Sequence, residues 1–171
     1  MATFNSTKMT NLLANTPISA EQGESWGRDR VWIGTMEITA AYTTGDIIRL
    51  ERLPWNLRPN SLIMAWDDLN SSTLPADLGL YYPNGTVIDI DEFASALALG
   101  TATVPTDVLF EAAAADIDRM GKELWEYAGL ASMPVGHPSN TGMADLCLTL
   151  GTNGGTTAAG TISWCLKGSI D

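Results

Sequence analysis

The sequence is poor in basic residues, in cysteine and in histidine. Its 171 residues include 9 Lys and Arg against 20 Asp and Glu, so the formal net charge is 9 − 20 = −11. Nucleic-acid binders draw most of their affinity from Lys and Arg that neutralise phosphates, and anionic membrane surfaces attract the same residues. We therefore expect neither a nucleic acid nor a membrane among the partners.

Long apolar segments are also missing. No stretch approaches the roughly 20 apolar residues that a membrane-spanning helix requires. Residues 1–8 lack the charged start and the apolar run of a signal peptide. The sequence thus predicts a protein that has no membrane anchor and is made and used without export.

The residues on which many enzymes and metal sites depend are scarce. Cys147 and Cys165 are too few for a disulfide framework or a Cys-rich zinc site. His137 stands among turn-forming residues, with no G-x-S-x-G nucleophile motif, and is interpreted as a loop residue. A Walker A loop and a G-x-G-x-x-G motif are both absent. We predict no catalytic residue, no cofactor and no metal, and hence a protein that is not an enzyme.

Two acidic clusters leave an alternative open. Asp67-Asp68 and residues 89–92 could supply oxygen ligands to Ca²⁺ or the carboxylate pair of a glycosidase. The second cluster, however, lacks the central glycine and the later glutamate of an EF-hand loop. The structural interpretation is that Asp67-Asp68 closes a strand, whereas Asp89 or Asp91 caps a helix.

The first 28 residues differ from the rest of the chain. They are polar, contain Pro17, Gly23 and Gly27, and show no sustained period. We expect residues 1–28 to form an irregular N-terminal arm that packs against a neighbouring subunit or another partner. Residues 29–171 are expected to form a single domain, which is long enough to bury a core without metal or disulfide support.

Alternation of apolar and polar residues, typical of strands, follows the arm. In the first run, Trp32 and Ile38 fall on one side and Val31 and Ile33 on the other. Asn84-Gly85, between two such runs, predicts a β-hairpin. The expected strands cover residues 30–38, 47–53, 61–67, 77–82, 86–89, 145–150 and 160–167.

Helical patterns are confined to the middle of the chain. Residues 91–99 are rich in Ala and Leu and end at Gly100, and a three-and-four spacing of apolar residues follows over 117–128. With so few helices between the strands, a parallel α/β sheet is excluded. The fold class is therefore all-β, a sandwich or barrel with one or two short helical insertions.

Several segments, in order along residues 30–170, resemble one family. The family is that of the small jelly-roll cement, or decoration, proteins on the outside of tailed-bacteriophage capsids. Its pattern is a "G-D-hydrophobic-hydrophobic-R-L" strand ending in "L-P", an apolar strand ending in acids, an "L-D-L-G"-like strand, a "G-K-x-L-W-E" segment and a "G-T-I"-type final strand. The matching segments are Tyr42–Pro54, Leu62–Asp68, Ala76–Leu80, Gly121–Glu126 and Gly160–Ile162.

The resemblance implies a jelly-roll fold and a structural role in the virion. A protein of this kind binds the outside of the capsid lattice, cements the shell of the major capsid protein, and associates with itself as a homodimer or homotrimer. It is assembled in the host cytoplasm and located on the capsid surface. Two other functions stay open: a carbohydrate- or receptor-binding jelly-roll module of a head fibre, and a small hydrolase on a β-scaffold.

Tryptophans supply the candidates for core and contact positions. Trp32, Trp66 and Trp164 lie on expected strands and are predicted to be core residues. Trp26 lies in the polar arm, and Trp55 lies in an expected loop bracketed by Pro54 and Pro59. With Arg28, Trp26 and Trp55 are therefore the candidate contacts with the capsid or with another subunit.

The acids gather in the middle of the chain. Residues 89–126 contain nine acids and two bases, so their charge of −7 makes up most of the total of −11. We expect this segment to form an acidic outward surface, which is either a simple solvated face or a band that keeps like-charged neighbours away.

The two cysteines test the topology. If the last two strands formed a hairpin centred near residue 156, Cys147 and Cys165 would oppose each other with Cα atoms about 4.5 to 5.5 Å apart. A strict jelly roll places these strands in different sheets, roughly 10 Å apart. We favour the wide separation, and we expect free thiols.

Overall fold

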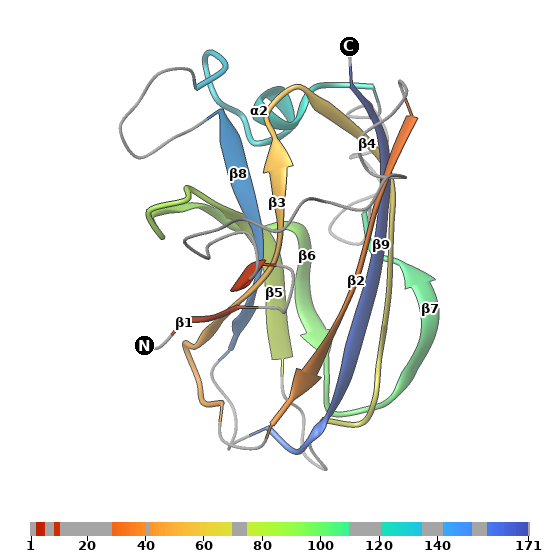
Figure 1. The fold of residues 1–171 in the computed structure, drawn as a ribbon. Coiled ribbons are helices and arrows are strands. Elements are labelled where there is room, and N and C mark those ends of the chain that lie inside the picture. The colour runs from red at the N-terminus through yellow and green to blue at the C-terminus, as the bar shows by residue number, and fades with distance from the viewer. Residues whose placement is uncertain are drawn as a thin grey trace.

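The computed structural model describes residues 3–5, 9–10, 29–39, 42–69, 75–109, 121–134, 142–151 and 157–170. Two β-sheets face each other across an apolar core (Figure 1). The strands are β1 (Thr3–Asn5), β2 (Asp29–Ile38), β3 (Ile47–Pro54), β4 (Leu57–Trp66), β5 (Pro75–Tyr81), β6 (Val87–Ala98), β7 (Thr103–Asp107), β8 (Met143–Leu150) and β9 (Gly160–Ile170), and the helix is α2 (Leu124–Tyr127).

The strand order is jelly-roll-like. One sheet, here called sheet A, has the order β1-β3-β8-β5-β6, and the other, sheet B, has the order β2-β9-β4-β7. Each sheet joins strands that are distant in the sequence, because β8 lies between β3 and β5 and β9 lies between β2 and β4. This confirms the expected all-β, jelly-roll-like fold.

Alternation along the strands decides which side chains enter the core. On β2, Trp32 and Ile38 are buried between the sheets, whereas Ile33 is 63% exposed on the outside. Trp66 and Trp164 are buried as well, so the three tryptophans predicted for the core are all there. Gly34 contributes by having no side chain, because a Cβ at this position would overlap the ring of Trp164.

The predicted hairpin at Asn84-Gly85 is confirmed. It joins β5 to β6, which pair antiparallel. Gly85 adopts a φ of 89°, which glycine tolerates far better than other residues, and Asn84 Oδ1 accepts a hydrogen bond from the Thr86 amide at 3.0 Å.

The first predicted helix is wrong. Residues 91–98 continue strand β6, which pairs with β5 through several register shifts. Ala96 and Ala98 are exposed while Leu97 and Leu99 are buried, which is the two-residue period of a strand. Alanine is small and favours helices, so it concealed this alternation. Asp89 and Asp91 consequently lie on a strand and cap no helix.

Of the second predicted helix, over residues 117–128, the structure describes a turn near the end as helix α2. Helix α2 spans four residues, and Glu123 begins it through a capping box with Glu126. Residues 117–120 of the expected helix lie outside the described residues. Leu124 and Tyr127 are the buried side chains of the turn.

The expected loop between Pro54 and Pro59 is mostly strand. Only Trp55 and Asn56 form a turn, and it joins β3 in sheet A directly to β4 in sheet B. Trp55 is 1% exposed and belongs to the core. The turn crosses between the sheets, and this directs the indole into the space between them instead of toward solvent.

Part of the expected arm belongs to the domain. Strand β1 pairs in parallel with β3, Phe4 stacks on Tyr42 with ring centroids 3.9 Å apart, and Met9 is fully buried. For these residues the expectation of an arm that leaves its own domain is wrong, because they extend sheet A and bury apolar surface. Residues 11–28 lie outside the described residues.

The cysteines lie in different sheets, as favoured above. Cys147 is on β8 of sheet A and Cys165 is on β9 of sheet B, so the hairpin pairing of these strands is wrong. Both thiols are free. The hairpin hypothesis failed because apolar alternation fits either neighbouring strands or strands that face each other across a core.

Candidate interaction surface

The outer face of sheet A carries a buried ionic cluster. The Asp145 carboxylate on β8 accepts hydrogen bonds from Arg52 Nε at 2.6 Å and from Arg52 Nη2 at 3.0 Å. Arg49 Nη1 lies 3.5 Å from the same carboxylate. The Asp145 side chain is fully buried and both arginines are 14% exposed. Glu51, beside Arg52 on β3, is a second buried acid in this region, and its Oε1 accepts a hydrogen bond from the Arg52 amide at 3.2 Å.

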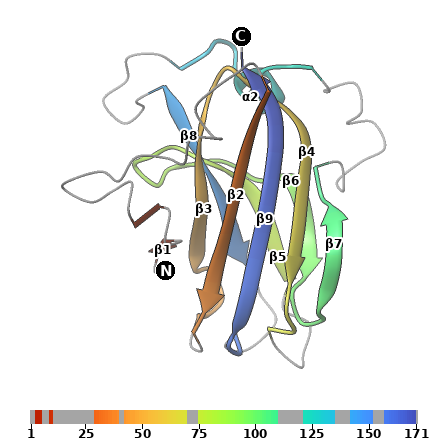
Figure 2. The same ribbon diagram turned by 45° about the vertical axis from the view of Figure 1, so that its right-hand side comes forward.

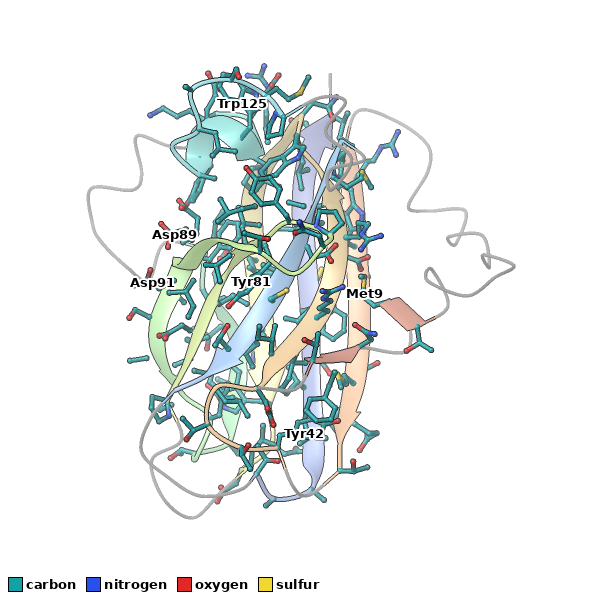
Figure 3. The ribbon with its side chains drawn as sticks, turned by 90° about the vertical axis from the view of Figure 1, so that its left-hand side faces the viewer. Met9, Tyr42, Tyr81, Asp89, Asp91 and Trp125 are labelled. Atoms are coloured by element: carbon teal, nitrogen blue, oxygen red, sulfur yellow. The ribbon has the colours of Figure 1, made fainter. Side chains whose placement is uncertain are left out.

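A small apolar cluster of Ile47, Tyr81 and Cys147 lies beside these charges. The Tyr81 hydroxyl shares a hydrogen bond of 2.7 Å with the Thr149 hydroxyl. Burial raises the pKa of Tyr81 and also that of the Cys147 thiol. At Gly79 the backbone of β6 approaches so closely that a Cβ would clash with it. Sheet A therefore buries its outer apolar residues with its own chain (Figure 3).

Acidic side chains line β6 at the edge of sheet A. Asp89 Oδ1 accepts a hydrogen bond from the Asp91 amide at 3.2 Å, and Asp77 Oδ1 accepts one from Ala96 at 2.9 Å. A hydrogen bond between the Asp89 and Asp91 side chains, followed by partial desolvation and the Asp89 charge, raises the pKa of Asp91. Glu92 is buried, so the expected acidic outward surface is not continuous.

Neither a metal site nor a membrane-spanning helix is present among the residues that the structure describes. These contain no group of three or more His, Cys, Asp or Glu side chains that could hold a metal ion. Asp67 and Asp68 follow the end of β4 and are exposed, as the structural interpretation predicted. No described helix has the length and apolar character needed to cross a bilayer.

The outer face of sheet B differs from that of sheet A. Figure 2 shows β2, β9, β4 and β7 side by side, with no described strand or helix in front of them. Ile33, Cys165 and Ile63 form one row across β2, β9 and β4. Ile33 is 63% exposed, and the other two side chains are partly exposed. An apolar row that crosses three strands and stays open to solvent is a candidate interaction surface.

The structure places the predicted contact residues differently. Trp55 is buried and does not contribute to the molecular surface, while Trp26 and Arg28 lie outside the described residues, as does His137. The open row on sheet B was not singled out from the sequence. A signal for it existed, because residues 31–33 are apolar on both sides of the predicted strand, whereas a half-covered sheet needs only one apolar face.

The described residues define a two-sheet β-sandwich of jelly-roll-like topology with one open sheet face. No protein-family model and no curated protein matches the sequence. A chain in the capsid of Ralstonia phage GP4 is similar in structure, with 19% identity, a TM-score of 0.60, and coverage of 99% of this chain and 98% of that chain. A chain in the capsid asymmetric unit of cyanophage Pam1 follows with 15% identity, a TM-score of 0.52, and coverage of 90% and 93%. At these identities the comparison shows a shared fold.

Proposed function

We propose that this chain is a structural protein of a phage virion that binds the outside of the capsid lattice and cements the shell of the major capsid protein. The observation that carries the proposal is the match in fold over nearly the full length of both chains with a component of a phage capsid. A second capsid chain with the same fold supports it. The proposed location is the capsid surface, after assembly in the host cytoplasm.

The chemistry of the described residues is compatible with this role. A cementing protein acts through buried contact area, with apolar anchors at the centre of each contact. The open face of sheet B, with its partly exposed row of Ile33, Cys165 and Ile63, offers such area. The net charge of −11 disfavours nucleic acid as an alternative partner to the capsid. Trp26 and Arg28 remain the proposed contacts of the N-terminal segment with the capsid or another subunit.

The test is binding to shells assembled from the major capsid protein of the same phage. Purified protein is mixed with the shells and sedimented through sucrose. We expect co-sedimentation at a fixed ratio to the major capsid protein, and a higher temperature of shell disruption. Sedimentation of the shells without the protein would contradict the proposal.

Variants locate the contact. The double substitution W26A/R28A should weaken shell binding at least about tenfold while the circular dichroism spectrum is retained. Lys122→Ala, which removes an exposed positive charge elsewhere, is the matched control and should bind like the wild type. Binding to a glycan array without binding to shells would instead favour a receptor-binding module of a head fibre.

A further inference from the structure

The outer face of sheet B has an open apolar centre. Sheet A buries the apolar cluster around Cys147 on its own outer side. On sheet B, the row of Ile33, Cys165 and Ile63 has no described strand or helix in front of it, and Ile33 is 63% exposed (Figure 2). Contact between water and an apolar row costs free energy that a second surface would recover. The face therefore has the apolar centre of a contact surface.

Acids outnumber bases around this apolar row. The charged residues on the outward side of the four strands or directly beyond their ends are four acids and two bases: Asp29, Glu37, Asp67, Asp107, Arg58 and Lys167. Asp107 lies in the central row, where it pairs with Ile63. Arg58 is already paired with Glu123, with its Nη2 3.4 Å from the carboxylate. The face is therefore net negative, like the whole chain at −11.

Three of these acids are held in place by neutral donors of the same sheet. Glu37 Oε1 accepts a hydrogen bond from Thr161 Oγ1 at 2.8 Å, and Asp67 Oδ2 accepts one from the Thr161 amide at 2.9 Å. Asp107 Oδ2 accepts one from Ser61 Oγ at 2.6 Å. Within the part of the chain that the structure describes, none of the three takes part in an ion pair. These carboxylates are thus fixed in position, and they have no cation to release before they bind one from a partner.

We propose that the open face of sheet B is the surface with which this chain binds the capsid, and that the capsid presents to it apolar side chains surrounded by lysines and arginines. The inference rests on the proposed function and adds the face and the chemistry of the partner. Apolar side chains of the capsid cover the central row. Its cations pair with Asp107 and with Glu37 and Asp67, which lie on either side of Thr161.

The charge and the size of the face support this occupant. A second copy of the chain carries the same negative charge and is repelled, whereas a basic surface is attracted. Four strands about 4.8 Å apart, with outward positions from residue 29 to residue 37 of β2, give an area on the order of 500 Å². A stable pair of soluble proteins buries about 800 Å² on each side. The face therefore needs further contacts, which adjoining subunits of a lattice supply.

Neutralising two of the acids tests the chemistry of the partner. Glu37→Gln combined with Asp67→Asn keeps oxygen acceptors toward Thr161 but removes both charges. Binding to shells of the major capsid protein at about 50 mM NaCl should weaken at least about tenfold. The matched control is Asp89→Asn combined with Asp91→Asn, which removes the same charge from β6 of the other sheet and should bind like the wild type. Equal weakening by the two double variants would show that only the net charge matters, and would overturn the proposal.

A substitution in the central row tests the apolar contact. Ile33→Lys should weaken shell binding at least about tenfold, because it places a cation in the apolar centre and opposite a basic partner. Val87→Lys is the matched control: Val87 is also an exposed apolar residue, at 46%, but it lies on β6 of sheet A. Circular dichroism checks that both variants fold. Normal binding by a folded Ile33→Lys variant would overturn the proposal.

Cys165 provides a readout on the wild-type chain. Its rate of alkylation by N-ethylmaleimide, followed by the intact mass of this chain, should fall at least about fivefold on shells, because the thiol lies in the central row. Shell binding with an unchanged alkylation rate would overturn this inference and leave the proposed function intact. Failure of the wild type to bind shells would contradict the proposed function and this inference together. Protection of Cys165 in the free protein would assign the face to a contact between copies and overturn the proposal.

Discussion

Asp145 shows how much a single buried charge depends on its neighbours. Its carboxylate has no exposed surface and is held by Arg52 at 2.6 Å and approached by Arg49 at 3.5 Å. Asp145→Asn keeps the shape but removes the carboxylate charge that contacts both arginines. We expect a loss of about 3 kcal/mol in the free energy of unfolding, measured with urea and circular dichroism. A loss below about 1 kcal/mol would show that the arginines find other partners.

The contribution of Asp91 to the stability of the fold depends on pH. Its pKa is raised in the folded state by the hydrogen bond with Asp89. A raised pKa means that the fold favours the protonated acid, so this stabilisation is present at low pH and is lost as the pH rises through the folded-state pKa. Asp91→Asn keeps a side-chain donor and removes the charge.

We therefore expect Asp91→Asn to stabilise the protein at neutral pH, by about 0.5 kcal/mol or less because the site is solvent-screened. The gain should disappear near pH 3, where the wild-type acid is itself protonated. Urea unfolding of both proteins at the two pH values measures the difference. A gain that does not change with pH would contradict this account.

At the scale of elements, Arg58 joins the start of β4 to the turn before α2. Its Nη1 donates to the Gly121 carbonyl at 2.7 Å, and its Nη2 lies 3.4 Å from Glu123. Arg58→Met removes these bonds but keeps an aliphatic chain of similar length. Hydrogen exchange should become faster in residues 124–130, while global stability falls by only about 1 kcal/mol, because the core is untouched. Slower or unchanged exchange there would contradict this role.

The strands also differ in how clearly their residues predict them. Strands β3 and β9 could be predicted because Leu50 and Trp164 alternate with polar or small residues, and β2 could be predicted although Trp32 is flanked by apolar residues. Strand β6 could not, since its register shifts against β5 interrupt the period, and alanine occupies outward positions. Of the candidate contacts, Trp55 was misplaced, because a sequence shows that a turn is present but not that the turn crosses between two sheets.

At the scale of the whole molecule, long-range strand pairing determines the topology, which the local sequence patterns do not specify. Strand β8 pairs with β3 and β5, and β9 pairs with β2 and β4, although β8 and β9 are consecutive in the chain. No local pattern encodes this choice, because both arrangements bury the same leucines. The open face of sheet B follows from the choice: it places Ile33, Cys165 and Ile63 in one row.

The positions of the two cysteines allow an experiment to test this topology. Cys147 lies in the apolar cluster on the outside of sheet A, and Cys165 lies on the outside of sheet B. The thickness of the sandwich thus separates the thiols, beyond the roughly 7 Å between Cα atoms that a disulfide allows. Oxidation of the native protein with diamide should give no intrachain disulfide, as measured by intact mass after alkylation.

The two thiols should also differ in reactivity. Cys165 is partly exposed, so in dilute protein it should react with maleimide within minutes. Cys147 is fully buried and its pKa is raised by burial, so it should react only as the protein unfolds. Adding urea to the unfolding midpoint provides the control, because both thiols should then react. Rapid native reaction of Cys147, or a native disulfide between the two, would contradict the placement of β8 and β9 in separate sheets.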